Sequence, residues 1–531
     1  MDIKGTKVYD NLGNLHNKSG NPHSGGTVLA LEAPGEVEAV SFEAAGLGDR
    51  SYLVHDGRVG VVVDPQREPQ RYLAAAESLG VSITHVLETH IHNDYVSGGL
   101  GLARQLGATY VLPQGEQLAF AEECTTLGDG DELTTGSLKV SALATPGHTP
   151  HHLSYLLSGR TGARSYVCTG GSVLPNGVGR TDLLGDERAD ELAQAQWHSV
   201  RRLLSQLDAA TRLLPTHGFG SFCTVTPAAG AEGTGAETRA EAGELASRAE
   251  GARAEAGGAE AGELAAGELT IGLERERNPA ARAALEDFVL ALRQDRPPVP
   301  SYYRYMAPLN RAGAASPHYQ PTARLDAAAL ERWLSTGSVV ADLRPRRAFA
   351  AGHRQGSLNI ELGSNLTTYF GWVVPFEAPY TLIACSYEEV ERSRHLLARI
   401  GRELVSGFVL ASDLDLERAR HYPVATFADL SAAVQRGERP LVLDVRHRSE
   451  WRAGHLALAC HVPLPELEAQ RGSLPPEQPI WVHCGAGFRA ALAASRLSAW
   501  GMSPVLVDDL FGRAAPYGLE MTVGDGPSGR L

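Results

Sequence analysis

The sequence is poor in cysteine, in clustered cationic residues and in long apolar runs. Its six cysteines have no short paired spacing, which argues against a disulfide framework and for free thiols in a reducing cytoplasm. No stretch reaches the roughly 18 apolar residues of a membrane span, and residues 1–26 lack the apolar core of a signal peptide. A net charge of −14 disfavours nucleic acid, because phosphate binding needs clustered Lys and Arg. We therefore expect a cytoplasmic protein that binds neither nucleic acid nor membrane.

The length of 531 residues predicts three or four domains. We expect a polar N-terminal arm over 1–26, a first domain over 27–320, and two further domains over 323–420 and 424–525. An acidic insertion over 227–272 interrupts the first domain. Its composition of Ala, Gly and Glu can bury little apolar surface and predicts a flexible segment.

Strand and helix patterns alternate through the first domain. The predicted strands lie at 37–42, 51–55, 59–64 and 109–112, and the predicted helices at 69–79, 98–105, 190–207 and 278–293. Two further strands lead to His148 and Gly171. This alternation predicts an α/β fold of the αββα sandwich type, with the functional residues at one edge of the sheets.

The most informative motif follows an apolar run at 83–87. Residues 89–94 read T-H-I-H-N-D. In an extended loop that leaves a buried strand, residues i and i+2 point the same way. His90 and His92 are therefore placed to bind one cation, with Asp94 as a further ligand or as a group that orients them.

This motif resembles the H-x-H-x-D-H signature of the metallo-β-lactamase superfamily, with Tyr95 in place of the last histidine. Later segments keep the superfamily's order: T-P-G-H-T at 145–149, T-G-G at 169–171, G-R-T-D at 179–182 and T-H-G at 216–218. The resemblance makes His148 a metal ligand and places Gly171 where the family has a carboxylate ligand. The G-R-T-D segment narrows the resemblance, which covers about residues 27–310, to the persulfide dioxygenase and glyoxalase II branch.

Two departures from the family pattern bear on the chemistry. Tyr95 and Gly171 remove two ligands of a second cation, so a binuclear hydrolase is not expected. The remaining set is His90, His92 and His148, with Asp94 or Asp182 in place of the lost carboxylate. Persulfide dioxygenases hold one non-haem iron, so the resemblance implies one Fe(II). Zinc is the alternative metal, because three imidazoles suit both, and a site that has lost its metal is the other interpretation of Gly171.

The two C-terminal segments resemble each other and the rhodanese sulfurtransferases. Residues 339–344 read V-V-A-D-L-R before a G-H at 352–353, and residues 441–446 read L-V-L-D-V-R before a G-H at 454–455. A strand that ends D-x-R with a later G-H is the rhodanese pattern. We therefore expect a tandem pair of rhodanese-like α/β domains with parallel sheets.

The second of these units carries a loop suited to a reactive thiol. Residues 484–489 read C-G-A-G-F-R between a buried-type strand and an Ala-rich helix. A thiol at a helix N-terminus meets free N–H groups and the positive end of the dipole, which favour the thiolate. The loop resembles the rhodanese C-x-x-G-x-R loop. The resemblance makes Cys484 the nucleophile that forms an enzyme persulfide, with Arg489 as a positive charge for the sulfur donor. The remaining loop residues are the expected substrate-binding cradle: Gly485, Ala486, Gly487 and Phe488.

The first unit has a cysteine near the same place but a different loop. Residues 385–390 read C-S-Y-E-E-V, without glycine or arginine. The two carboxylates disfavour a thiolate at Cys385 and repel an anionic donor. We therefore interpret the first unit as degenerate and structural.

The metal site and the thiol loop share one substrate class, sulfane sulfur on a low-molecular-weight thiol. We expect iron-dependent oxidation of a thiol persulfide to sulfite, coupled to rhodanese transfer between thiosulfate and the carrier thiol. The alternatives are a mononuclear metal thioester hydrolase of the glyoxalase II kind, and a sulfurtransferase with a metal-free β-lactamase-like scaffold. The sequence leaves the oligomeric state open, with a homodimer as the default expectation.

Overall fold

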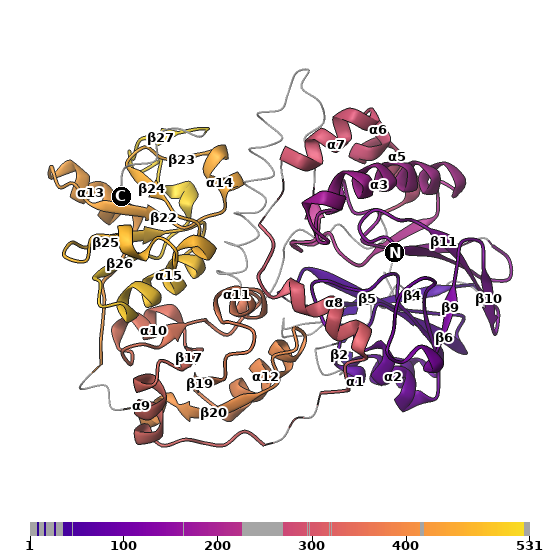
Figure 1. The fold of residues 1–531 in the computed structure, drawn as a ribbon, viewed down its shortest axis with the longest axis horizontal. Coiled ribbons are helices and arrows are strands. Elements are labelled where there is room, and N and C mark those ends of the chain that lie inside the picture. Colours follow the sequence, from indigo (N-terminus) through magenta and orange to yellow (C-terminus); the bar gives the residue numbers. More distant parts are fainter. Residues whose placement is uncertain are drawn as a thin grey trace, which may run out of the picture. The chain divides into compact units, whose positions relative to one another are not determined.

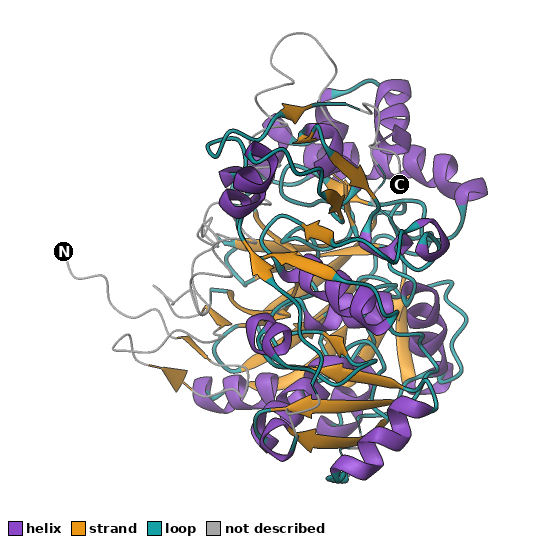
Figure 2. Cartoon of the chain, turned by 90° about the vertical axis from the view of Figure 1, so that its left-hand side faces the viewer, coloured by secondary structure: helices purple, strands orange, loops and turns teal. Residues whose placement is uncertain are grey.

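A computed structural model describes most of the chain. The described residues are 36–44, 46–162, 164–225, 269–294, 296, 298–317, 319, 321–414 and 419–524, with three short strands before them, β1 (Val8–Tyr9), β2 (Leu15–His16) and β3 (Gly26–Thr27). The predicted acidic insertion, apart from residues 269–272, and most of the predicted N-terminal arm lie outside them. The chain forms two compact units, in which helices (purple in Figure 2) and strands (orange) alternate (Figure 1). Among the described helices, none is long and apolar enough to cross a membrane.

The first unit contains two large sheets. The first sheet has the order β4-β5-β6-β7-β8-β9 and the second the order β10-β11-β12-β13-β15. The strands of the first sheet are β4 (Glu38–Ala44), β5 (Asp49–His55), β6 (Val59–Val63), β7 (Ser82–Leu87), β8 (Thr109–Pro113) and β9 (Cys124–Leu127). Those of the second are β10 (Glu132–Thr135), β11 (Leu138–Ala144), β12 (Leu153–Ser158), β13 (Ser165–Gly170) and β15 (Arg212–Pro215), and β14 (Val178–Gly179) pairs with β16 (Thr224–Val225).

Helices cover the outer faces of both sheets (Figure 1). Val62 packs with Tyr72 of α1 outside the first sheet, whereas Val61 packs with Tyr155 between the sheets. Neighbouring residues of β6 therefore face opposite layers, as the strand pleat requires. The helices of this unit are α1 (Pro69–Leu79), α2 (Gly99–Leu106), η1 (Ala121–Glu123), α3 (Asp186–Gln206), α5 (Ile271–Arg277), α6 (Pro279–Arg282), α7 (Leu285–Gln294) and α8 (Tyr303–Ala312). The predicted αββα sandwich is confirmed.

One predicted helix, 278–293, is wrong as a single element. It is divided into α6 and α7 at Ala283, which has extended backbone angles. The carbonyl of Ala283 accepts a hydrogen bond from the indole of Trp197 in α3, at 3.0 Å. A tertiary hydrogen bond thus engages a carbonyl that a continuous helix would use internally.

The second unit contains two parallel sheets, with the orders β18-β17-β19-β20 and β21-β26-β25-β22-β24. The strands are β17 (Val339–Asp342), β18 (Leu358–Asn359), β19 (Tyr380–Ala384), β20 (Val405–Leu410), β21 (Val424–Ala425), β22 (Leu441–Asp444), β24 (Ala459–His461), β25 (Ile480–His483) and β26 (Pro504–Val507), with β23 (His455–Leu456) paired to β27 (Met521–Thr522). The helices are α9 (Ala327–Ser335), α10 (Arg346–Ala351), α11 (Leu366–Val373), α12 (Tyr387–Ala398), η2 (Ala411–Asp413), α13 (Phe427–Gln435), α14 (Arg448–Ala453), η3 (Leu464–Glu466), η4 (Arg471–Ser473), α15 (Phe488–Ala499) and η5 (Phe511–Arg513).

The D-x-R and G-H motifs make the same contacts in both halves of this unit. In each half the arginine binds the aspartate two residues before it and the carbonyl of the later glycine. The first half has Arg344 at 2.6 Å from Asp342 and 2.9 Å from the Gly352 oxygen, and the second has Arg446 at 2.6 Å from Asp444 and 2.8 Å from the Gly454 oxygen. Each motif therefore closes one strand onto the turn that follows the next helix.

Candidate functional site

The predicted metal motifs meet because their strands end at the same side of the sandwich. In the second sheet β11, β13 and β15 run in the same direction, since β12 lies antiparallel to both β11 and β13 and β13 is parallel to β15. His148, Gly171 and His217 follow the carboxyl ends of these three strands. The loop after β7 brings His90 to them from the first sheet.

Three histidines form the centre of this cluster: His90, His148 and His217. One ligand atom from each lies within 4.8 Å of the others. The Nε2 atoms of His90 and His217 are 3.4 Å apart, and Nε2 of His148 has no hydrogen-bond partner among the described residues. All three side chains are buried.

The hydrogen bonds behind the three rings fix their tautomers. The Nδ1 atoms lie 2.8 Å from the Thr89 hydroxyl, the Arg180 carbonyl and the Asp49 carboxylate, respectively. The carbonyl and the carboxylate accept, and the Thr89 hydroxyl donates to Asp64, so it too accepts from its histidine. Each Nδ1 therefore carries the proton, and each Nε2 presents a lone pair to the centre. Three lone pairs converge on one point, and no N–H or O–H group of the described residues faces them. Such an arrangement can supply the ligand atoms for a cation.

Burial keeps these imidazoles neutral. Burial and the neighbouring histidines lower the pKa of His90 and of His148 well below 6.5. Burial also lowers the pKa of His217. Neutral imidazole is the form that binds a metal ion.

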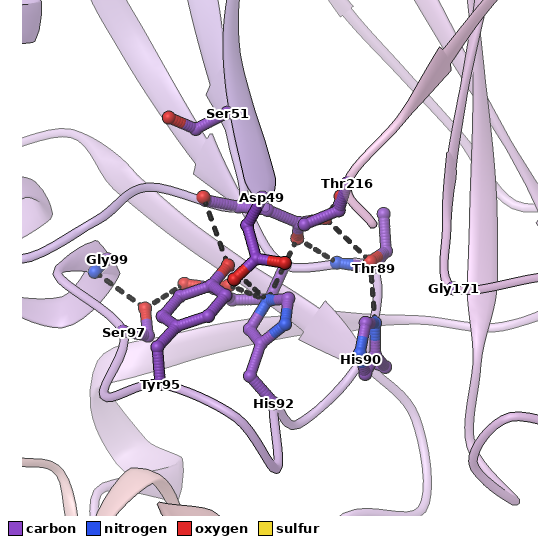
Figure 3. A network of polar contacts seen from close by, with 12 residues as sticks. Asp49, Ser51, Thr89, His90, His92, Tyr95, Ser97, Gly99, Gly171 and Thr216 are labelled. Atoms are coloured by element: carbon purple, nitrogen blue, oxygen red, sulfur yellow. Dashed lines mark hydrogen bonds and ion pairs between the residues drawn. The ribbon is translucent and has the colours of Figure 1, made fainter. Parts of the chain in front are cut away.

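His92, a predicted ligand, has a different environment. Its Nε2 lies 2.9 Å from the Tyr95 hydroxyl and 3.1 Å from Glu88, and its ring stacks on that of Tyr95 (Figure 3). Burial lowers its pKa, but Asp64 and Glu88 outweigh burial and raise the pKa to about 10. Nδ1 of His92, by contrast, has no hydrogen-bond partner among the described residues, so this atom and not Nε2 is the one that the ring offers to an ion.

Asp94, the other predicted ligand, lies behind His217. Its Oδ2 is 3.2 Å from Nδ1 of His217, and it neighbours Asp49; burial raises the pKa of both carboxyls to about 7. His92, Asp94 and His217 also form a triplet with ligand atoms within 4.8 Å, as do Asp64, His90 and His92. The ligand roles of His92 and Asp94 stay predictions. Asp182 is held by the Arg180 guanidinium in two 2.8 Å bonds and belongs to none of these triplets.

Asp64, which the sequence motifs did not single out, accepts hydrogen bonds from two loops of the site. Its carboxylate accepts from the backbone and hydroxyl of Thr89, both at 2.7 Å, and from the Thr216 hydroxyl. Asp64 has a φ of 51°, a left-handed conformation that is uncommon outside glycine. It thus joins the ends of β6, β7 and β15. The sequence motifs also did not single out His217 as a candidate ligand, although the T-H-G segment after a strand carried its signal.

The thiol loop has the predicted form. Cys484 follows β25, is 1% exposed, and accepts a hydrogen bond from the Gly487 N–H at 3.1 Å. Gly487 has a φ of 93° and precedes α15. The Gly485 oxygen accepts from the Phe511 N–H, and the Phe488 ring lies 5.3 Å from that of Tyr369.

Arg489 does not present an uncompensated charge to the loop. It forms a two-pronged ion pair with Glu450, at 2.5 and 2.9 Å. Burial would raise the pKa of Glu450, but Arg489 holds that pKa well below its usual range. The catalytic role of Arg489 stays a prediction, and its charge is balanced by that carboxylate.

Cys385 is out of register with Cys484. Asp342 pairs with Ile383 in the first half, and Asp444 pairs with His483 in the second. Ala384 therefore occupies the position of Cys484, and Cys385 lies one residue further on. Burial and Glu389 raise the pKa of Cys385, and the degenerate role of this loop stays a prediction.

Two families match this sequence. Residues 47–217 match the metallo-beta-lactamase superfamily, and residues 426–509 match the rhodanese-like domain. A hydroxyacylglutathione hydrolase from Rhizobium etli is 32% identical over 239 residues, which are 44% of this chain and 82% of the relative. A mitochondrial persulfide dioxygenase from Bos taurus is 30% identical over 183 residues, 34% of this chain and 65% of the relative, so the chain spans just under two thirds of that protein. The solved structure of a metallo-beta-lactamase from Staphylococcus aureus, 23% identical, has the same fold with a TM-score of 0.56 over 70% of this chain and 99% of that one.

Proposed function

The chain belongs to the metallo-β-lactamase superfamily and carries a C-terminal rhodanese-like domain, and from this premise we propose that it is an enzyme of sulfur metabolism with two reactions. The first unit oxidises the sulfane sulfur of a low-molecular-weight thiol persulfide to sulfite. The second transfers sulfane sulfur through Cys484. The observation that carries the first reaction is the set of three converging Nε2 lone pairs on His90, His148 and His217.

These three residues fit one metal ion. The partnerless Nε2 of His148 and the fixed tautomers of the set leave the three lone pairs without any donor from the described part of the chain. We propose Fe(II), held by His90, His148 and His217, with zinc as the alternative. The ion would supply open coordination positions for O₂ and for the persulfide sulfur.

The surrounding residues orient the ligands and exclude water. Thr89, Arg180 and Asp49 hold the three rings through Nδ1, and Asp64 fixes the loops that carry two of them. The set also argues against a binuclear hydrolase. Tyr95 bonds to His92 instead of supplying an imidazole, and Gly171 supplies no carboxylate for a second ion.

In the second reaction the Cys484 thiolate attacks the outer sulfur of thiosulfate. A new S–S bond forms, the S–S bond of thiosulfate breaks, and sulfite leaves with the bonding electron pair. A thiolate of the carrier then removes the outer sulfur and regenerates Cys484. The Gly487 N–H, 3.1 Å from Sγ, stabilises the negative charge on sulfur.

Oxygen consumption tests this proposal. We expect the iron-reconstituted chain to take up O₂ on addition of a thiol persulfide and to release sulfite in parallel. His148→Ala should abolish both and leave thiosulfate sulfur transfer intact, and Cys484→Ser should do the reverse. Sulfur transfer without O₂ uptake in the reconstituted wild type would reduce the first unit to a scaffold and contradict the oxidation.

A mononuclear thioester hydrolase is the second candidate for the first unit. The similarity to the Rhizobium etli hydroxyacylglutathione hydrolase over 82% of that protein favours it. Thioester cleavage by the zinc form, with no O₂ uptake by the iron form, would select this reaction.

A further inference from the structure

The two halves of the second unit meet at the thiol loop. Arg346, the first residue of α10, belongs to the first half, which has no reactive loop of its own. Its Nε lies 2.6 Å from Oδ1 of Asp508, and its Nη2 donates to the oxygen of Ala486 at 3.3 Å. Its Nη1 lies 2.8 Å from Glu361, so the guanidinium is fixed at all three nitrogens.

The same groups pack against the backbone of Gly487. A Cβ at Gly487 would lie 2.4 Å from Oδ1 of Asp508 and 3.0 Å from Nε of Arg346. Only glycine therefore allows this close approach, and the φ of 93° also favours it. Because the Gly487 N–H is the group that bonds to Cys484, Arg346 and Asp508 determine where that N–H points.

A helix of the first half covers another side of the loop. The Tyr369 ring of α11 lies 5.3 Å from that of Phe488, and the Trp372 ring lies 5.3 Å from that of His447. Tyr369 and Trp372 are buried, and Phe488 and His447 are partly buried. The first half thus contacts the loop through a charged residue and through an aromatic wall.

We propose that Arg346 is a positioning residue for sulfur transfer by Cys484, supplied by the half that lacks a reactive cysteine. Its planar fork holds the Ala486 carbonyl and Asp508 together and so aims the Gly487 N–H at Sγ. A guanidinium can bridge two acceptors in fixed directions, whereas an ammonium acts as a point charge. The inference rests on the proposed role of Cys484.

The other charged and titratable groups near the loop occur mostly in pairs, so none of them duplicates this bridge. They are Arg347 with Asp508, Arg489 with Glu450, Arg446 with Asp444, and the histidines His447 and His483. Arg347 binds the same carboxylate from the solvent side at 2.5 Å, and its side chain is 69% exposed. It provides a matched control, because it shares the charge and Asp508 but not the loop carbonyl.

The test compares Arg346→Gln, Arg346→Lys and Arg347→Gln in the full chain. The first measurement is the pH dependence of alkylation at Cys484, followed by mass spectrometry of its peptide, and the second is the kcat and KM of thiosulfate sulfur transfer. We expect both Arg346 variants to shift the alkylation profile to higher pH and to lower kcat about tenfold, the size expected for one hydrogen bond to a charged group. Arg347→Gln should match the wild type.

Three outcomes would overturn the proposal. The first is an unchanged alkylation profile in Arg346→Gln, and the second is a wild-type profile in Arg346→Lys, which would mean that the charge alone suffices. The third is a loss of kcat in Arg347→Gln as large as that in Arg346→Gln. The alkylation profile reports on the Cys484 thiol without any turnover, so it tests the role of Arg346 by itself. Retained sulfur transfer in Cys484→Ser would instead refute the proposed function of Cys484.

Discussion

The ring of His148 fills the space that a side chain at position 171 would need. A Cβ at Gly171 would lie 2.2 Å from Cδ2 and 2.8 Å from Nε2 of His148. Gly179 also lies close to this ring, since a Cβ there would be 2.7 Å from Nδ1. A side chain at position 171 and the observed position of the His148 ring therefore exclude each other.

Restoring the carboxylate should therefore harm the site. We expect Gly171→Asp, and already Gly171→Ala, to displace His148, lower the metal content and cost roughly 1–3 kcal/mol of unfolding free energy, as for overpacked cores. Metal analysis and urea unfolding measure both effects. Gly363→Ala is the control, since its Cβ would meet nothing within 4 Å. Tighter metal binding by Gly171→Asp would contradict this arrangement.

The choice of metal ligands can be measured directly. We expect His217→Ala to lose most of the bound metal, because its Nε2 faces that of His90 at 3.4 Å. His92→Gln should lose less metal than His217→Ala, because Nε2 of His92 is engaged by Tyr95 and Glu88 and only its Nδ1 is open. Metal content of the purified variants gives the readout.

An exposed neighbour serves as the reference for these variants. His151→Ala should keep full metal content, since its side chain is exposed. Metal lost in His92→Gln but kept in His217→Ala would return the ligand set to the one expected from the H-x-H-x-D motif.

Cys385 and Cys484, in the two halves of the second unit, should behave oppositely. Cys484→Ser should abolish thiosulfate sulfur transfer, because the Gly487 N–H donates a hydrogen bond to the sulfur of Cys484 and stabilises its thiolate. Cys385→Ser should leave the rate within about twofold. Burial and Glu389 raise the pKa of Cys385 and so favour its thiol form, which is less reactive than the thiolate. A substantial loss in Cys385→Ser would mean that the first half accepts sulfur itself.

Acid should destabilise the second unit through His483. Burial lowers the pKa of His483 to about 4, with partial compensation by Asp444, against 6.5 for an ordinary histidine. Between these values the unfolded chain binds the proton and the folded chain does not. Stability is therefore lost as the pH falls from 6.5 towards 4, by at most about 1.4 kcal/mol per pH unit from this residue.

Unfolding free energies at about pH 7 and about pH 5 check this slope. His483→Asn should show a shallower decrease than the wild type, because asparagine does not titrate. His151→Asn, at an exposed position, should keep the wild-type slope. Equal slopes in wild type and His483→Asn would show that His483 has the same pKa in the folded and the unfolded chain, contrary to this expectation.

Local sequence determined the elements and the order of the motifs. Helix α1 spans Pro69–Leu79 as predicted, and the strands before His90 and Cys484 end where the apolar runs end. Strand pleat and helix capping depend on neighbouring residues, so these features can be deduced from the chain alone. The thiol loop is likewise contiguous, and its glycine and helix N-terminus lie where the sequence places them.

Tertiary structure alone decided which side chains meet. His217 joins His90 across 127 residues, Arg346 reaches Asp508 across 162, and Glu450 engages Arg489 across 39. The fold also decides that Nε2 of His92 meets Tyr95, Glu88 and Asp64. Burial makes each polar atom find a partner from whichever loop the fold brings near. The motif therefore identified the kind of chemistry, and packing between distant strands selected the residues available to perform it.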